Sequence, residues 1–143
     1  MEKVIQLNPQ EAVVLYNQQK RQLESLLQQT EIITAYLSDL RMTSLTLKEI
    51  SGMKEGALFH VSLGSGTFLP VKLAEKSVKT DSGMNVFIEA DAKKLSEQLA
   101  ERAEKTKNIL KQMHEQTDKL ASQLGSLENQ LKQAIEKQGM KSD

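Results

Sequence analysis

The sequence predicts an α+β fold in which a long antiparallel pair of helices is joined by two β-hairpins. At both ends of the chain, apolar residues recur at steps of three and four, the spacing of a helix face. Only the stretch 57–90 alternates apolar and polar residues between glycine-containing turns, as strands do. The 143 residues are 38% hydrophobic and 3% aromatic, which suits a thin helical contact in a single domain better than a thick core.

The first helix is expected over residues 8–51. Asn8 is a suitable N-cap, Pro9 suits the first helical position, and Glu11 can complete a capping box. Gly52 is expected just after the helix in the left-handed conformation, because helices commonly end on such a glycine.

Two series of residues spaced by seven run through this helix and interleave as steps of three and four. We call these positions, and their counterparts in the second helix, the seam. This is the a/d pattern of a coiled coil, and polar residues within it weaken the coil but can help to fix its register. The seam of the first helix consists of Tyr16, Gln19, Leu23, Leu26, Thr30, Ile33, Leu37, Leu40, Ser44 and Leu47.

The central block 57–90 divides into four short strand runs, which is most simply explained by two consecutive hairpins. Gly64-Ser65-Gly66 provides the first tight turn and Asp81-Ser82-Gly83 the second. Pro70 cannot donate a ladder hydrogen bond, which indicates an edge strand or a bulge. The expected strands are 58–63, 67–74, 77–80 and 84–89.

An isolated hairpin is marginally stable, and a pair of hairpins has unpaired edges and an apolar face without cover. The block therefore needs partner strands, and another subunit is the natural source. The residues that we predict to mediate oligomerisation are Phe59, Val61, Leu63, Phe68, Leu69, Val71, Val78, Val86 and Ile88.

The second helix is expected over residues 91–138, with Asp91 as its N-cap. Gly125 is the one weak helix former within this run of heptads. Its charged residues have mixed sign, as on a solvated coiled-coil flank. The seam of the second helix consists of Leu99, Ala103, Thr106, Leu110, Met113, Thr117, Leu120, Leu124, Leu127, Leu131, Ala134 and Gln138.

Because the hairpins join the helices at one end, both chain termini are expected to meet at the other end. Several apolar residues there lie off the seam. They are either ordinary scattered surface side chains or a contact that holds the end of the coil together. Alternatively, they form an exposed patch suited to holding unfolded segments of another protein. The predicted client-binding residues, which we call the tip residues, are Val4, Ile5, Leu7, Val13, Val14, Leu131, Ile135 and Met140.

Composition excludes several classes of function. Lys+Arg and Asp+Glu both number 19, so the formal net charge is zero, which argues against a strongly basic surface for nucleic acid or anionic lipid. No cysteine is present, no run of apolar residues is long enough to cross a membrane, and the N-terminus lacks the pattern of a signal peptide. We therefore expect a soluble cytoplasmic protein.

The sequence carries no catalytic or metal-binding pattern, so we expect no catalytic residue, metal or cofactor. His60 and His114 lack neighbours at the spacing of metal ligands, and Gly64-Ser65-Gly66 is a hairpin turn rather than a phosphate loop. An enzyme would need a pocket with convergent polar groups, which two thin helices and hairpins do not offer.

The order of elements and two local sequences resemble the prefoldin family, and more closely its archaeal-type alpha class. Val61–Phe68, read as VSLGSGTF, is similar to the glycine turn between the family's first two strands. Val78–Asp91 is similar to the second hairpin, which leads into the C-terminal helix. Beta-class subunits have one hairpin, so four strand runs favour the alpha class.

The resemblance implies a hexamer of two alpha-class and four beta-class subunits, whose hairpins form an intersubunit β-barrel body with six coiled coils. It further implies an ATP-independent holdase whose tips bind unfolded client proteins and pass them to a group II chaperonin. Some alpha-like members assemble with themselves into filaments. A scaffold protein, either a filament former or a spacer subunit, is therefore the alternative to the chaperone subunit.

Overall fold

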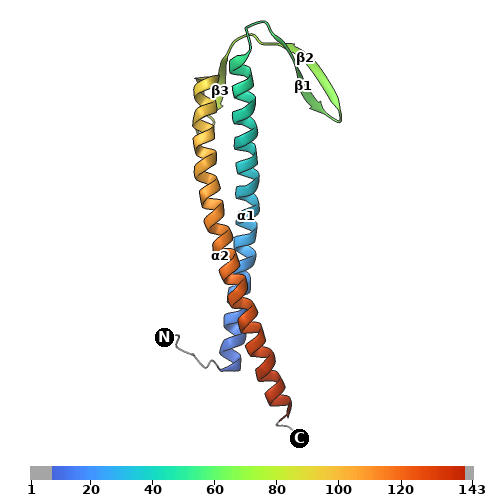
Figure 1. The fold of residues 1–143 in the computed structure, drawn as a ribbon, viewed down its shortest axis with the longest axis vertical. Coiled ribbons are helices and arrows are strands. Elements are labelled where there is room, and N and C mark those ends of the chain that lie inside the picture. Colours follow the sequence, from blue (N-terminus) through green and yellow to red (C-terminus); the bar gives the residue numbers. More distant parts are fainter. Residues whose placement is uncertain (1–7, 141–143) are drawn as a thin grey trace. The chain divides into compact units, whose positions relative to one another are not determined.

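The computed structural model describes residues 8–140, with side chains described as far as Lys137. The elements follow the predicted order of helix, two hairpins and helix (Figure 1). They are α1 (Pro9–Gly52), β1 (Leu58–Gly64), β2 (Thr67–Lys72), β3 (Ser77–Asp81), β4 (Phe87–Asp91) and α2 (Ala92–Met140). The chain divides into two compact units: unit 1 is Met1–Thr34 with Asn108–Asp143, and unit 2 is Ala35–Lys107.

Both helices begin at the predicted caps. The Gln10 backbone N–H donates a hydrogen bond to Asn8 Oδ1 at 3.2 Å, and the Lys94 backbone N–H donates to Asp91 Oδ2 at 3.2 Å. Each side chain thus satisfies one of the backbone donors that a helix start leaves free. Asp91 is also the last residue of β4, so the strand passes directly into α2.

The end of α1 differs from the prediction. The helix runs to Gly52, but Gly52 does not have a positive φ; the left-handed residue is Gly56, with φ of 86°. Instead, the Met53 N–H donates to the Ile50 carbonyl at 3.1 Å, which tightens the last turn without a left-handed residue. Gly56, the left-handed residue, lies where the chain turns from α1 toward the hairpins. Its N–H donates a hydrogen bond to the Leu73 carbonyl at 2.7 Å.

Unit 1 contains the first part of α1 and most of α2. Every seam residue of this unit with a described side chain is buried or half-buried, which confirms the heptad pattern here. The most covered are Thr30, Leu124 and Leu127, all less than a tenth exposed. Apolar contact along this line is what holds the two helix segments together.

Unit 2 contains the end of α1, both hairpins and the start of α2. Leu37, Leu40 and Leu47 of α1 are about 5% exposed, and Ala103 of α2 is similarly buried. Ser44 and Ser96 join the helices reciprocally: Ser44 Oγ donates to the Ser96 carbonyl at 2.8 Å, and Ser96 Oγ donates to the Ser44 carbonyl at 2.7 Å. A shift of either helix would break both bonds, so this pair defines the register.

The other polar seam residues behave differently from Ser44. The Thr30 hydroxyl donates to the Leu26 carbonyl of its own helix at 2.7 Å, so it makes no interhelical hydrogen bond. Thr106 and Thr117 do the same, at 2.8 Å each. Gln19 Oε1 is buried and has no hydrogen-bond partner among the described residues.

The hairpins form two separate antiparallel sheets, β1–β2 and β3–β4. The first turn has positive φ at both central residues, 52° at Ser65 and 72° at Gly66, as a type I′ turn requires. After β2, hydrogen bonds between Leu73 and the segment Gly56–Ala57 continue the pairing of the two chain segments.

The predicted start of the fourth strand is wrong by three residues. β4 begins at Phe87 rather than Met84, because Gly83, Met84 and Asn85 have φ of 111°, 52° and 60° and therefore belong to the turn. Ser82 N–H and Oγ both donate to the Val86 carbonyl at 2.9 Å, and Gly83 N–H donates to Asp81 Oδ1 at 2.9 Å. Val86 thus closes the turn and lies outside the strand.

Candidate functional site: hairpin faces and helix ends

The first hairpin has one wholly apolar face. Directly paired residues of antiparallel strands lie on the same face. The pairs Phe59–Val71 and Val61–Leu69 therefore make up this face. The opposite face holds the pairs His60–Pro70 and Ser62–Phe68, and is more mixed.

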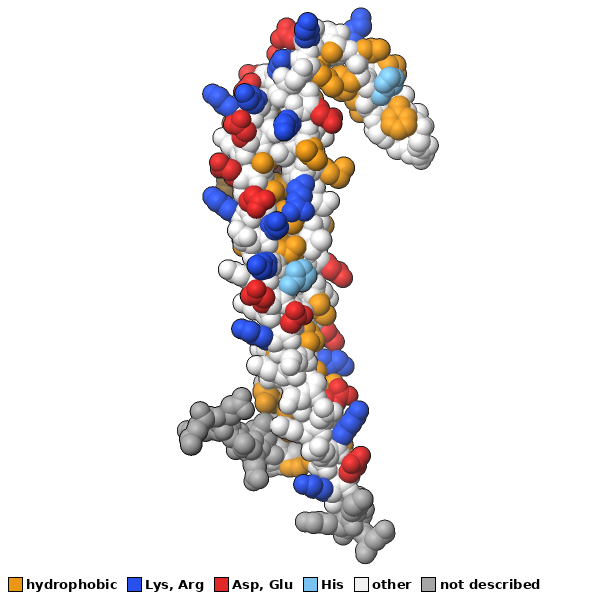
Figure 2. Space-filling model, viewed as in Figure 1, with side chains coloured by type: hydrophobic (Ala, Val, Ile, Leu, Met, Phe, Trp, Pro, Cys, Tyr) orange, Lys and Arg blue, Asp and Glu red, His pale blue; other side chains and the backbone are white. Residues whose placement is uncertain are grey.

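These apolar side chains are poorly covered by the chain itself. Val61 is 41% exposed and Leu69 48%, while Leu63 and Phe68 are about 60% exposed. Figure 2 shows hydrophobic side chains on the surface of this hairpin. Burying such surface is worth about 25 cal/mol per Å², so the hairpin favours contact with another apolar surface.

The second hairpin has a less apolar and better covered face, on which Val78, Thr80 and Ala90 are half-buried. Val78 pairs with Ala90, and Thr80 with Ile88, on one face, whereas Lys79 pairs with Glu89 on the other. Ile88 is 49% exposed. In the turn before β4, Val86 is 56% exposed.

Each sheet has two strands, so each of the four strands lacks a neighbour along one side in the described part of the chain. Of the nine predicted oligomerisation residues, none is buried. Phe59, Val71 and Val78 are half-buried, and the other six are exposed. The hairpins thus present both free backbone edges and apolar side chains, the two features that strand addition uses.

The described tip residues lie in unit 1. Val13 and Val14 at the start of α1 are 47% and 57% exposed, and Ile135 near the end of α2 is 68% exposed. Leu131 is half-buried on the seam. Val4, Ile5 and Leu7 lie outside the described residues, as does the side chain of Met140.

Family comparison identifies the chain. The sequence model described as Prefoldin subunit matches residues 19–137, which cover most of both helices and all four strands. The chain belongs to the prefoldin family. It is therefore a prefoldin-type chaperone subunit, and prefoldin subunits form oligomeric complexes with one another.

Solved prefoldin structures share the fold. A filamentous prefoldin from Methanocaldococcus jannaschii matches with a TM-score of 0.59 at 21% identity, covering 85% of this chain and 98% of that one. The prefoldin beta subunit from Thermococcus strain KS-1 matches with a TM-score of 0.58 at 18% identity, covering 94% and 96%. No curated protein matches the chain significantly.

The two histidines were the remaining candidates for chemistry. His60 and His114 are both exposed, on β1 and α2. Within residues 8–140, no group of three or more His, Asp or Glu side chains is placed to hold a metal ion. No helix in that range is long and apolar enough to cross a membrane.

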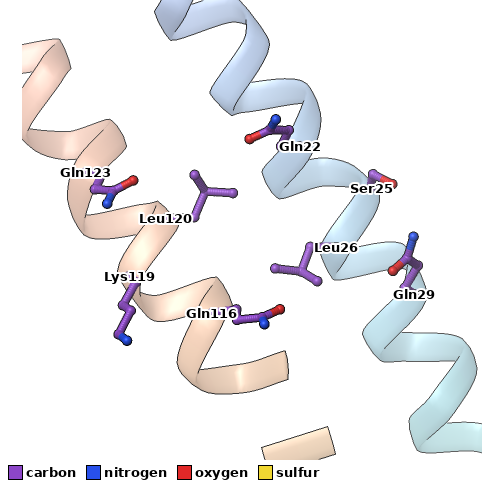
Figure 3. A pocket seen from close by; sticks show the side chains of 8 residues that line it. All are labelled: Gln22, Ser25, Leu26, Gln29, Gln116, Lys119, Leu120 and Gln123. Carbon is purple, nitrogen blue, oxygen red and sulfur yellow. The ribbon is translucent and has the colours of Figure 1, made fainter. Parts of the chain in front are cut away.

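Sequence reasoning missed one feature, a groove between the two helix segments of unit 1. Its cavity volume is about 430 Å³. Figure 3 shows Leu26 and Leu120 pointing into the space between the helices, with glutamine side chains around them. The lining residues are Gln22, Ser25, Leu26, Gln29, Gln116, Lys119, Leu120 and Gln123.

Proposed function

We propose that this chain is an alpha-class prefoldin subunit that assembles through its hairpins with beta-class subunits. The assembly holds non-native proteins without ATP and passes them to a group II chaperonin. The observation that carries the proposal is the presence of two hairpins, each with unpaired strand edges and with exposed apolar residues such as Val61 and Ile88. Two hairpins fit the alpha class, and the uncovered faces fit a subunit that completes its sheets with other chains.

Exposed apolar residues near the helix ends support client binding there. Val13, Val14 and Ile135 belong to one compact unit and lie off the seam, so coiled-coil packing does not explain them. Non-native proteins expose apolar side chains, and such a surface can hold them weakly in many orientations.

The test measures light scattering of a chemically denatured client that is diluted into buffer without nucleotide. The full chain with a beta-class partner is expected to suppress aggregation. The triple variant V13S/V14S/I135S, and a form lacking residues 1–8 and 136–143, should each lose most of this suppression.

A matched control replaces exposed apolar residues elsewhere in the same unit. Leu27, Ile32 and Ile109 are 46%, 69% and 50% exposed, so L27S/I32S/I109S removes a similar amount of apolar surface. The control should retain suppression. If both triple variants lost suppression of aggregation equally, or if neither lost it, the assignment of client binding to the tip residues would be contradicted.

A self-assembling scaffold is the second candidate, since the unpaired edges of both hairpins suit joining copies of the same chain. Sedimentation of the purified chain alone separates the two candidates. Long polymers favour the filament, whereas small species that form hexamers only with a beta-class subunit favour the chaperone.

A further inference from the structure

The outer face of α1 in unit 2 has an apolar patch that the helix pair leaves uncovered. Met42 and Leu45 lie three residues apart and therefore share one face of the helix. They are 67% and 63% exposed. With Leu40 and Ser44 on the seam, Met42 has the heptad position opposite the seam and Leu45 a neighbouring one, so pairing with α2 leaves both free. We call these two residues the outer patch.

The connection between α1 and the first hairpin has the features of a hinge. Gly52 ends α1 and Gly56 precedes β1, and a Cβ added at either glycine would meet no atom within 4 Å beyond the adjacent residues. Glycine tolerates a wide range of backbone conformations, and hinges consist of a few residues at element ends that absorb such changes. Within residues 8–140, no hydrogen bond joins β1 or β2 to a helix. The hairpin can therefore rotate about this connection without losing such a bond.

We propose that the first hairpin of the unassembled chain folds back along α1, in a closed form that places its apolar face on the outer patch. This face consists of the pairs Phe59–Val71 and Val61–Leu69, which the structure shows in an open, largely uncovered form. Closure occupies the surface that the proposed assembly uses, so it competes with assembly and protects the face until a partner binds. The inference rests on the proposed assembly through the hairpins and adds an autoinhibited state to it.

The lengths of helix and strand match in the closed form. Leu45 and Met42 lie seven and ten residues before the end of α1, or about 10 and 15 Å along the helix at 1.5 Å per residue. Val61 lies four residues after Ala57, or about 13 Å along the strand at 3.3 Å per residue. A hairpin that reverses direction at the hinge therefore brings Val61 to a level between Leu45 and Met42.

Polarity selects the face that turns inward. The four residues of the apolar face carry no charge, so closure buries no ionised group of the hairpin. His60 and Lys72 lie on the opposite face and keep their contact with water. Closure removes apolar surface of both the hairpin and the helix from water, which is favourable.

The size of the outer patch favours the chain's own hairpin over a second copy. Stable contacts between separate proteins bury at least about 1,000 Å², and two side chains fall far short of that area. A segment tethered a few residues away has a high effective concentration, so a small contact suffices to hold it for part of the time. The closed form should therefore be populated in the free chain and yield to a partner that offers a larger surface.

The first test is disulfide formation under copper–phenanthroline oxidation of the full-length chain, which has no cysteine of its own. The variant L45C/V61C should cross-link in the absence of other subunits, because closure brings the two Cβ atoms within the roughly 4.5 Å that a disulfide requires. The matched control L45C/S62C moves the second cysteine by one residue, to the opposite face of β1. It should cross-link at least about tenfold more slowly, since that face points away from α1.

The second test measures the affinity of the chain for a beta-class prefoldin subunit by sedimentation. Closure lowers the apparent affinity by the fraction of open molecules, so M42S/L45S should bind at least about twofold more tightly. The matched control L27S/I32S also removes exposed apolar side chains of α1. Ile32 lies 20 residues before the end of α1, or about 30 Å, which is beyond the reach of the hairpin, so the control should bind as the original chain does. Circular dichroism verifies that each variant keeps its helices.

Equal cross-linking rates of the two cysteine pairs would overturn the proposal. A rate that rises in proportion to chain concentration would also overturn it, because a second copy would then cover the outer patch. Unchanged affinity of M42S/L45S would show that no closed form competes with assembly, which overturns the autoinhibition. Cross-linking needs no partner, so it separates this inference from the proposed function. Selective cross-linking without assembly would reject the proposed assembly alone, whereas assembly without selective cross-linking would reject the closed form alone.

Discussion

The seam and the hairpins of unit 2 use similar residues with opposite outcomes. Leu40 on the seam is 5% exposed, whereas Leu63 on β1 is 62% exposed. α1 and α2 supply apolar partners for each other within one chain, but neither hairpin receives cover of that kind. The difference shows that the helices complete their own contact, whereas the described part of the chain leaves the hairpin side chains largely uncovered.

The reason lies in the backbone as well as in the side chains. A helix pairs its N–H and C=O groups internally, so it needs a neighbour only for its apolar stripe. A strand in a two-stranded sheet has a row of backbone groups free along one side. The hairpins therefore lack both strand pairing on one side and apolar cover, and the proposed assembly with other subunits would supply both.

The largest expected effect is a difference in stability between a seam variant and a hairpin variant. Leu40→Ala should lower the free energy of unfolding by about 2–5 kcal/mol, because it leaves a cavity in a buried contact. Leu63→Ala should change it by no more than about 0.5 kcal/mol in the unassembled chain. Urea denaturation followed by circular dichroism, at a concentration where the chain is dispersed, measures both. Similar losses in the two variants would remove the distinction between the regions.

The next effect concerns the hairpin alone. Val61→Asp places a carboxylate on the apolar face of the first hairpin, where assembly would bury it without a partner. Association with other subunits should weaken by at least about 100-fold, or ~2.7 kcal/mol, while the helix content stays unchanged.

Sedimentation measures this loss, and His60→Asp on the opposite face of the same strand is the matched control. The control should assemble much better than Val61→Asp. Equal weakening by both substitutions would mean that assembly does not use one face in preference to the other.

The smallest expected effect distinguishes side chains that hydrogen-bond across the two helices from those that hydrogen-bond within their own helix. Ser44→Ala and Ser96→Ala should each cost about 1 kcal/mol, since each removes one interhelical hydrogen bond. The two bonds form together, so the double variant should cost less than the sum. Thr30→Val, whose hydroxyl bonds its own helix, should stay within about 0.5 kcal/mol. Denaturation of the four variants tests this, and strictly additive serine costs would argue against a coupled pair.

Much of the fold follows from the sequence because its signals are local. The heptad spacing identified the buried positions, and Asn8 and Asp91 acted as the predicted caps. The pairing of Ser44 with Ser96 did not follow, because heptads repeat every seven residues and are compatible with several registers. The groove around Leu26 and Leu120 depends in the same way on which helix segments of unit 1 lie side by side, so the sequence did not predict it.

The errors have equally physical causes. Met84 and Asn85 continue the alternation of a strand, but the turn requires positive φ at both, which a pattern of apolar residues does not report. Gly52 and Gly56 both suit the left-handed conformation, and tertiary hydrogen bonding selected Gly56. The oligomerisation and tip residues remain predictions, since exposure in one chain does not identify what covers it.

The seam threonines affect which substitutions the helices tolerate and how strongly a sequence-based method predicts a coiled coil. The hydroxyls of Thr30, Thr106 and Thr117 each donate to a carbonyl in the preceding turn of their own helix, so they take no hydrogen bond from the opposite helix to satisfy them. To the opposite helix these positions resemble valine. Exchanges between threonine and valine should therefore accumulate almost freely at these positions, and a coiled-coil score that counts each threonine as a polar interruption will underestimate the pairing of these helices.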